Sequence, residues 1–368
     1  MNILHIIIGL NMGGAETSLF KLVTSSKSKN FKHIIISLTS LGIYGSLLKQ
    51  QGYIVYNLNL KNVFSLPFVI FKLIRLFLII KPDVVQTWMY HADLLGGLIA
   101  KLFNVKKILW CIRCTHVPIG SKSTFLLMKI CAYISNFIPT YIICVAESSK
   151  ESHIVYGYDS KKIIVIPNGF TVQSEVNPYK SNNYFGNNVF NNHIIVCSVG
   201  RFHPDKGIDI LINSANKVLK TNKNVHFVLA GHGCDNNNLL LINLLKVNNV
   251  LEHFTLLGQI NNVPSLLKSV DVFCLPSRTE GFPNVLAEAM SCGVPCVATN
   301  SGDAQILLGD NFQTVQVDSV AGLTNGLLNM VNETSEQRAF IGNSCFKRIE
   351  QYFSLSSVTN KYHILYRE

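Results

Sequence analysis

The chain has 368 residues, of which 48% are hydrophobic and 14% charged, and its formal net charge is +11 at pH 7. This length predicts two domains, and the high apolar content excludes a disordered chain. All of the excess positive charge lies in residues 1–172, which predicts an anionic partner for the first half. No nucleic-acid-binding motif accompanies the charge, so we do not expect nucleic acid as that partner.

Short apolar strands alternate with helical stretches along the whole chain, a pattern typical of parallel α/β sheets. The Asn-rich stretch 173–192 separates the two series and is interpreted as a linker. The fold class is therefore α/β, with two Rossmann-like, doubly wound domains (1–172 and 193–354) that present their ligand-binding strand ends to a shared cleft. Strands are predicted at 3–8, 33–38, 54–58, 84–87, 107–111, 141–145 and 163–167, and then at 194–199, 225–230, 254–257, 272–275, 295–298 and 314–317.

Two features bear on the cellular location. The apolar stretch 63–80 contains Pro67, Lys72 and Arg75, and cations near the middle of a membrane span are costly, so no transmembrane segment is expected. The ten cysteines are scattered and most lie in or beside apolar runs, which favours free thiols in a reducing cytosol over disulfides or a metal site.

The first strand runs into a glycine turn, Gly9 to Glu16, that leads into a helix. Glycines let a backbone approach a ligand, and the amides of a helix N-terminus can hold an anion. The turn lacks the Gly-x-Gly-x-x-Gly pattern, and no acidic residue ends the second strand, which argues against NAD. An ordinary tight turn remains an equal alternative at this point.

In the second half, strand 194–199 is followed by Gly200-Arg201 and then by Lys206-Gly207. Two cations around a loop constrained by Pro and Gly can converge on one pyrophosphate, Arg binding two oxygens and Lys adding a point charge. The alternative is a solvent-exposed basic loop.

A second loop, after strand 272–275, carries Glu280, and Glu288 follows eight residues later on a helix. Pro283 suits the first turn of that helix, whose N-terminus favours a phosphate. A carboxylate in the loop can bind sugar hydroxyls, and one further along the helix can bind a ribose. For Glu288 the alternative is an ordinary exposed helix residue.

Together these motifs resemble glycosyltransferase family 4, of the GT-B fold. Further similarity lies in Ile166-Pro167-Asn168-Gly169, in Gly231-His-Gly233 and in the segment 293–299. The resemblance implies a retaining transferase in which the last helix, 355–368, packs back on the first domain. The first domain would bind the acceptor and the second the nucleotide sugar.

The resemblance also assigns roles to residues. Arg201 and Lys206 would bind the donor phosphates together with the Gly14 amide, Glu280 would contact the transferred sugar, and Glu288 would bind the ribose. His91 would lie beside the sugar as a second catalytic residue, with a helix-capping histidine as the alternative. Backbone contacts to sugar and phosphate would come from Gly281, Phe282, Pro283, Asn284 and Val285.

The cations and the helix N-terminus can stabilise a leaving diphosphate where other enzymes use a metal, and the sequence has no Asp-x-Asp motif. We therefore expect no metal and no cofactor, only a nucleotide sugar as co-substrate, with UDP favoured. The expected acceptor is a glycan or a polyprenyl-diphosphate-linked sugar of surface polysaccharide synthesis (O-antigen, capsule or lipopolysaccharide).

Two stretches, 62–81 and 121–141, combine apolar and basic residues. Each either packs in the core or lies on an anionic membrane. The positive charge of residues 1–172 favours membrane association. We therefore expect a cytoplasmic enzyme that is peripherally bound to the inner face of the plasma membrane. The alternatives to a transferase are a nucleotide-sugar epimerase of the same fold and a non-catalytic nucleotide- or glycan-binding subunit.

Overall fold

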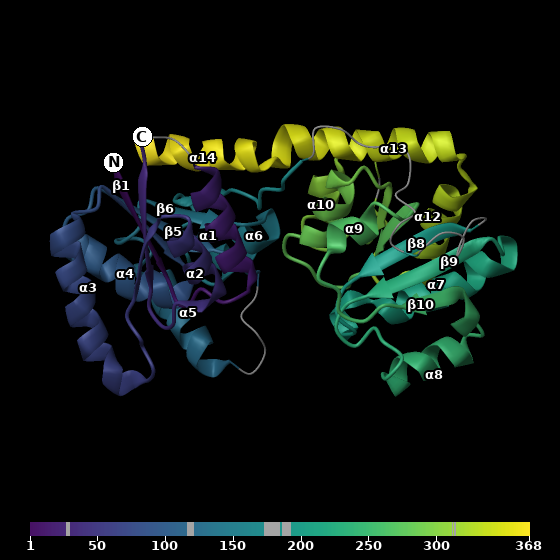
Figure 1. Ribbon diagram of the computed structural model, residues 1–368, viewed down its shortest axis with the longest axis horizontal. Coiled ribbons are helices and arrows are strands. Elements are labelled where there is room, and N and C mark those ends of the chain that lie inside the picture. Colours follow the sequence, from purple (N-terminus) through teal and green to yellow (C-terminus); the bar gives the residue numbers. More distant parts are fainter. Residues whose placement is uncertain (27–29, 116–120, 173–184, 186–192, 311, 313) are drawn as a thin grey trace. The chain divides into compact units, whose positions relative to one another are not determined.

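The computed structural model describes residues 1–26, 30–115, 121–172, 185, 193–310, 312 and 314–368. These residues form two compact units (Figure 1). Unit 1 consists of Met1–Gly169 and Leu355–Glu368, and unit 2 of Phe170–Ser354. The first unit thus ends at Gly169 rather than at 172. The predicted linker, 173–192, lies outside the described residues apart from Phe185.

Unit 1 is built on a seven-stranded parallel sheet in the order β3-β2-β1-β4-β5-β6-β7. The strand order reverses between β1 and β4, which is where ligands bind in doubly wound sheets. The strands are β1 (Asn2–Ile7), β2 (Lys32–Ser37), β3 (Ile54–Asn57), β4 (Val84–Trp88), β5 (Lys107–Ile112), β6 (Tyr141–Cys144) and β7 (Ile163–Val165). The helices are α1 (Gly14–Ser25), α2 (Gly42–Gln50), α3 (Leu66–Ile80), α4 (Tyr90–Leu102), α5 (Lys122–Ile134), α6 (Glu147–Val155) and α14 (Leu355–Arg367).

Helices cover both faces of this sheet, because alternate residues of each buried strand point to opposite sides. In β1, Leu4 and Ile6 pack in one apolar layer and Ile3 and Ile7 in the other. The second layer includes four side chains of α14, which follows unit 2 in the chain but belongs to unit 1: Val358, Tyr362, Leu365 and Tyr366.

Helix α3 and the turn before it are unusually apolar. Val63–Ile80 is the stretch of the described residues that is long and apolar enough to cross a membrane, with a mean hydropathy of 2.3 over 18 residues. Val69, Leu73, Phe77 and Ile80 pack in the core of unit 1, while most of the remaining apolar side chains of this stretch are exposed.

Unit 2 has a five-stranded parallel sheet in the order β10-β9-β8-β11-β12, which again reverses beside its first strand. Its strands are β8 (Ile194–Val199), β9 (Val225–Ala230), β10 (Phe254–Leu256), β11 (Val272–Leu275) and β12 (Cys296–Ala298). Its helices are α7 (Ile208–Thr221), α8 (Leu239–Val247), α9 (Val263–Leu267), α10 (Asn284–Ser291), α11 (Ala304–Leu308), α12 (Val320–Asn332) and α13 (Ser335–Arg348).

One predicted strand, 314–317, is absent. Val315 forms only a single parallel bridge with Thr299. The side chain of Gln305 accepts hydrogen bonds from the amide and the hydroxyl of Thr314, and the chain turns at Asp318, which has a φ of 60°. Val315 itself pairs with the end of β12, because its amide donates to the Ala298 carbonyl oxygen (2.9 Å) and its carbonyl oxygen accepts from the Asn300 amide (2.7 Å). The pairing stops at this one residue, although the residue pattern is that of a strand.

Candidate active site

The carboxyl edge of the unit 2 sheet carries the two predicted phosphate-binding cations. Arg201 follows β8 and is exposed, and Lys206 ends a short 3-10 helix, Pro204–Lys206. The next residue, Gly207, has a φ of 59°, and a Cβ there would lie 2.1 Å from the carbonyl oxygen of Pro276. Only glycine fits this turn, which brings the loop after β8 against the loop after β11.

Lys206 and Glu280 are in direct contact. The Lys206 Nζ lies 2.6 Å from the Glu280 Oε1, and the Ser277 hydroxyl donates a hydrogen bond of 2.7 Å to the same oxygen. The Glu280 side chain is 11% exposed, so this is a largely desolvated charge pair. The structure therefore brings together a phosphate-binding candidate and the sugar-binding candidate, which come from different loops.

A third loop, between β12 and α11, contacts the backbone next to Glu280. The amide of Asp303 donates to the Gly281 carbonyl oxygen (2.9 Å), and Thr299 donates through its hydroxyl to the Ser277 carbonyl oxygen (2.6 Å). A Cβ at Gly302, which has a φ of 54°, would lie 2.3 Å from the Gly281 carbonyl oxygen. The backbone on both sides of Glu280 is thus fixed by close contacts.

Helix α10 starts one residue later than predicted, at Asn284, because Pro283 is its N-cap residue. Phe282 is buried between the rings of Phe170 and Phe353, with centroid distances of 6.1 Å and 6.0 Å. Asn284 is exposed and Val285 half-buried, so the start of the helix lies at the surface of unit 2.

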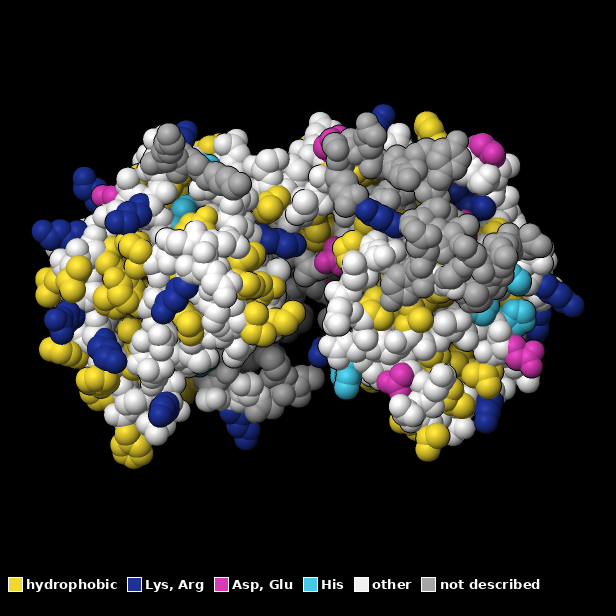
Figure 2. Space-filling view, viewed as in Figure 1, with side chains coloured by type: hydrophobic (Ala, Val, Ile, Leu, Met, Phe, Trp, Pro, Cys, Tyr) yellow, Lys and Arg dark blue, Asp and Glu magenta, His cyan; other side chains and the backbone are white. Residues whose placement is uncertain are grey.

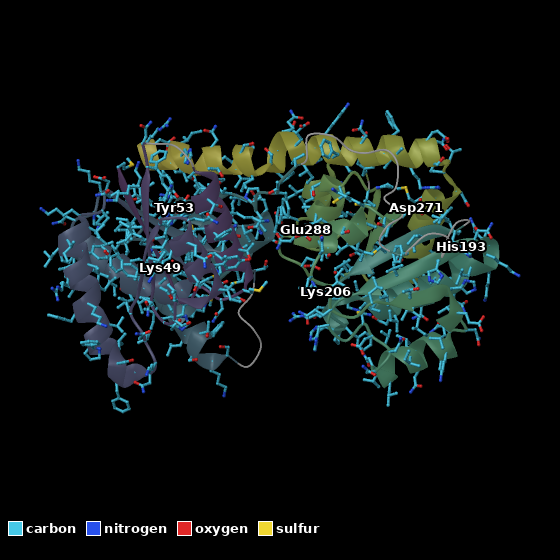
Figure 3. All side chains as sticks on the ribbon, in the orientation of Figure 1. Lys49, Tyr53, His193, Lys206, Asp271 and Glu288 are labelled. Atoms are coloured by element: carbon cyan, nitrogen blue, oxygen red, sulfur yellow. The ribbon has the colours of Figure 1, made fainter. Side chains whose placement is uncertain are left out.

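Glu288 is half-buried and lies one turn after Asn284 on the same face of α10. Figure 3 labels Glu288 and Lys206, both of which belong to unit 2. The first amides of a helix have no partner within it and attract anions. The unit 2 strand ends thus combine cations, carboxylates and a helix N-terminus, as the sequence predicted.

The two remaining predicted residues, Gly14 and His91, belong to unit 1. Gly14 is the first residue of α1 and is exposed, and a Cβ added to it would meet no atom within 4 Å. At Gly13 the same Cβ would lie 2.3 Å from the Glu16 Oε2, so this glycine leaves room for the Glu16 carboxylate. The space beside the Gly14 backbone is open to a ligand.

His91 is the second residue of α4 and lies at the surface directly after β4. The N-cap residue, Met89, has a φ of 70°, which is strained for a side chain of this size. Its carbonyl oxygen accepts from the amides of Ala92 and Asp93, so His91 is held in the first turn of the helix. Partial desolvation lowers the pKa of His91, which favours a neutral imidazole.

Comparison with known proteins gives two family matches that together span most of the chain. Residues 12–174 match the model of glycosyltransferase family 4, and residues 193–333 match that of glycosyl transferases group 1. The chain belongs to the family 4 glycosyltransferases. Its enzyme class is therefore established by relationship, while the roles of individual residues stay predictions.

Two relatives of this glycosyltransferase are named for a lipid-linked acceptor and for capsular polysaccharide synthesis. An Escherichia coli UDP-Gal:α-D-GlcNAc-diphosphoundecaprenol α-1,3-galactosyltransferase is 27% identical over 299 residues, covering 78% of this chain and 75% of its own. The Staphylococcus aureus capsular polysaccharide glycosyltransferase CapM is 25% identical over 307 residues, covering 80% and 79%. Both are named as transferases, not as epimerases or binding subunits.

The fold of this glycosyltransferase is GT-B, in agreement with the sequence analysis. Anabaena Alr3699/HepE, solved in complex with UDP, superposes with a TM-score of 0.82 over 99% of both chains at 20% identity. At this identity the likeness shows the fold alone.

Sequence reasoning missed two arginines beside the strand ends of this glycosyltransferase. In unit 1, Arg113 follows β5, lies over the Trp88 ring (5.7 Å) and donates to the side chain of Asn168, which also accepts from Ser18. In unit 2, Arg278 lies two residues before Glu280 and binds two carboxylates. No motif marks either, because each acts through residues far away in the sequence.

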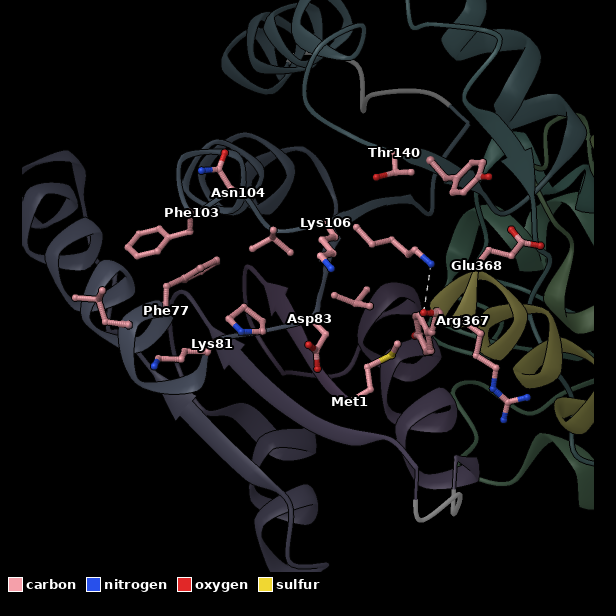
Figure 4. Close-up of a pocket in the computed structure, with 17 residues that line it drawn as sticks. Met1, Phe77, Lys81, Asp83, Phe103, Asn104, Lys106, Thr140, Arg367 and Glu368 are labelled. Atoms are coloured by element: carbon pink, nitrogen blue, oxygen red, sulfur yellow. Dashed lines mark hydrogen bonds between the residues drawn. The ribbon is translucent and has the colours of Figure 1, made fainter.

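A cavity of about 1000 Å³ lies away from the predicted site, at the amino-terminal edge of the unit 1 sheet (Figure 4). Its lining includes Phe77, Phe103, Lys81, Asp83 and Lys106. None of the predicted site residues lines it. Among the described residues, no group of three or more His, Cys, Asp and Glu side chains is arranged to hold a metal ion.

Proposed function

We propose that the protein transfers a sugar from a UDP-sugar to a polyprenyl-diphosphate-linked sugar or another glycan in surface polysaccharide synthesis, with retention of configuration. The observation that carries this proposal is the Lys206–Glu280 contact at the strand ends of unit 2, beside the N-terminus of α10. The E. coli galactosyltransferase, named for a UDP-sugar and a diphosphoundecaprenol acceptor, supports the choice of donor and acceptor.

The proposed chemistry follows from charge. As the bond between the anomeric carbon and the diphosphate breaks, negative charge builds up on the leaving UDP, where Arg201, Lys206 and the α10 amides stabilise it. The acceptor hydroxyl attacks the anomeric carbon on the same face, and its proton passes to the leaving phosphate oxygen. Glu280 and His91 hold the sugar, Glu288 binds the ribose, and the Gly14 amide contacts the diphosphate.

The donor site is tested with purified protein, a panel of UDP-, GDP- and ADP-sugars, and EDTA. One UDP-sugar should raise the melting temperature and be slowly hydrolysed in EDTA, because the cations replace a metal in stabilising the leaving group. Lys206→Ala and Glu280→Ala should each lower kcat/KM about 100-fold. No response to any donor, or a response that needs a divalent metal, overturns the proposed site or its metal independence.

We also propose that unit 1 binds the cytoplasmic face of an anionic membrane through α3 and α5. Both helices expose large apolar side chains beside cations, and Figure 2 shows hydrophobic and basic side chains intermixed on unit 1. Such a surface gains from apolar burial and from attraction to anionic lipid. The exposed apolar side chains are Val63, Phe64, Phe68, Phe71, Leu78 and Ile79 around α3, and Phe125, Leu126, Ile130, Tyr133 and Phe137 around α5.

Membrane binding is tested by co-sedimentation with vesicles of neutral phosphatidylcholine and with vesicles that also contain anionic phosphatidylglycerol. Binding should require the anionic lipid at physiological salt and weaken in the double variant Phe64→Ser/Phe71→Ser. Leu239→Ser/Leu240→Ser is the matched control, because both of these leucines are also exposed but lie in unit 2. Equal loss in the two double variants, or no binding at all, contradicts the proposal.

A further inference from the structure

Arg278 joins three loops of unit 2. Its guanidinium binds Asp209 through two nitrogens (2.6 Å and 2.8 Å), and its Nε lies 2.5 Å from the Asp318 Oδ1. One of the same nitrogens donates to the Pro204 carbonyl oxygen (2.7 Å). In addition, the Arg278 amide donates to the Asp205 carbonyl oxygen (2.7 Å).

These contacts lie close to the Lys206–Glu280 pair, but they do not involve the side chain of either residue. Pro204 and Asp205 precede Lys206 in the loop after β8, and Arg278 itself precedes Glu280 in the loop after β11. The contacts with the Pro204 and Asp205 carbonyl oxygens therefore connect the backbone just before Lys206 to the residue two positions before Glu280. Asp318, from the turn before α12, adds a third attachment.

The charge of Arg278 is already balanced by two carboxylates, so it is a poor candidate for a ligand of the donor phosphates. From this arrangement we infer that Arg278 is a positioning residue, which holds the Lys206 Nζ against the Glu280 carboxylate in the geometry that binds the donor. The inference rests on the proposed function, in which Lys206 and Glu280 contact the donor.

The geometry of the contacts requires arginine. A planar guanidinium can bind both Asp209 oxygens while its Nε reaches Asp318, whereas a lysine ammonium is a single point charge that cannot form the same fork. Arg278→Lys should therefore recover only part of the activity that Arg278→Met loses. Asp209→Asn keeps the shape of the partner but removes its charge, and should resemble Arg278→Lys.

The test is a double-mutant cycle on donor turnover with the UDP-sugar selected above. In the wild-type background, Arg278→Met should lower kcat/KM about 30-fold, while the affinity for UDP falls less than about 3-fold. In the Glu280→Gln background, Arg278→Met should lower kcat/KM less than about 2-fold, because the geometry that Arg278 maintains is already lost. Arg348→Met is the matched control, since Arg348 also binds backbone carbonyl oxygens in unit 2, those of Ile306 and Leu307.

The outcomes separate the two proposals. If Glu280→Gln itself leaves kcat/KM unchanged, the proposed donor site is wrong and the role of Arg278 falls with it. If Glu280→Gln is impaired but Arg278→Met is fully active, or loses the same factor in both backgrounds, only the positioning role is wrong. Should Arg278→Met fail to fold, Arg278→Lys and Asp209→Asn are measured in the same cycle with the same criteria.

Discussion

The charge pair of Lys206 and Glu280 does not block the binding of a phosphate. A lysine ammonium has three hydrogens to donate, and Glu280 takes one of them, while Ser277 shares the same carboxylate oxygen. The ammonium can therefore keep its contact with Glu280 and still donate to an incoming diphosphate. In the proposed site, Glu280 would both orient the lysine and lie beside the transferred sugar.

Gly14→Ala tests whether the donor diphosphate occupies the open space beside the Gly14 backbone in unit 1. The added methyl group would meet no atom of the protein within 4 Å, so the free energy of unfolding should change by less than about 1 kcal/mol. If the donor diphosphate contacts the Gly14 amide, the methyl group should lower kcat/KM about 10-fold or more. Enzyme kinetics and urea unfolding measure the two effects.

The control for this variant is Ser18→Ala, one turn later on α1, which removes a hydrogen bond to Asn168 within unit 1. Unchanged kinetics in Gly14→Ala would place the donor away from this amide.

At the residue scale, the sequence predicted which side chains lie at the strand ends but not what they touch. Arg201, Lys206 and Glu280 could be found because they follow apolar strands in loops with glycine and proline, and Glu288 because it lies on the helix that follows such a loop. The Lys206–Glu280 contact could not be, because it depends on how two loops 74 residues apart meet. The strained φ of Met89 has no sequence signal either.

The loops at the edge of unit 2 owe their shape to glycines at which a side chain is excluded. Gly207 and Gly302 combine a positive φ with a backbone oxygen of another loop within 2.3 Å of where a Cβ would be. These contacts join the loops after β8, β11 and β12 into one layer. Precision at the site therefore comes from backbone packing between loops as well as from side chains.

Gly207→Ala should destabilise unit 2 by about 3 kcal/mol, because it combines the strain of a positive φ with a clash against Pro276. Gly258→Ala is the control: its φ is also positive, at 63°, but its nearest neighbour is at an ordinary 3.4 Å, so only about 1 kcal/mol is expected. Chemical denaturation followed by circular dichroism compares the two. Equal losses would mean that the contact with Pro276 relaxes freely.

At the element scale, apolar runs bounded by turn residues predicted the strands of both sheets within a few residues. The prediction failed at 314–317, where pairing with β12 is limited to Val315, the Thr314 amide bonds to the side chain of Gln305, and the chain turns at Asp318. Capture of a backbone amide by a side chain leaves no trace in the alternation of apolar residues.

On the scale of the molecule, each unit has its own core, but only unit 1 contains tryptophan, Trp88 and Trp110. Tryptophan fluorescence therefore reports on unit 1 alone. Unit 1 buries His5 and His33 under α14, and a hydrogen bond of 2.9 Å joins their rings. The nearby His363, on α14, forms a hydrogen bond with Ser26. Burial and, to a smaller extent, proximity to His363 together lower the pKa of His33 to about 4.

Unit 1 should lose stability as the pH falls from 6.5 to 4. In this range the unfolded chain binds a proton at His33 that the folded chain does not bind, so unfolding is favoured. Above pH 6.5 His33 is neutral in both states, and its full contribution to the free energy of unfolding is present. His33 alone accounts for about 3 kcal/mol. Urea unfolding followed by tryptophan fluorescence measures the change.

In His33→Gln the difference in stability between pH 7 and pH 4 should shrink, while the exposed control His232→Gln should behave like the wild type. A wild-type stability of unit 1 that is constant from pH 6.5 to pH 4.5 would contradict a buried neutral His33.

The return of α14 to unit 1 has a consequence for biosynthesis. A ribosome that has made residues 1–169 has produced only part of the first unit, because the apolar layer that includes Leu22 and Ile35 still lacks Val358, Tyr362, Leu365 and Tyr366. Unit 2 is one continuous segment and can complete its core first. We therefore expect the nascent chain to carry an uncovered apolar surface while the whole of unit 2 is translated, which is the interval when it most needs chaperones.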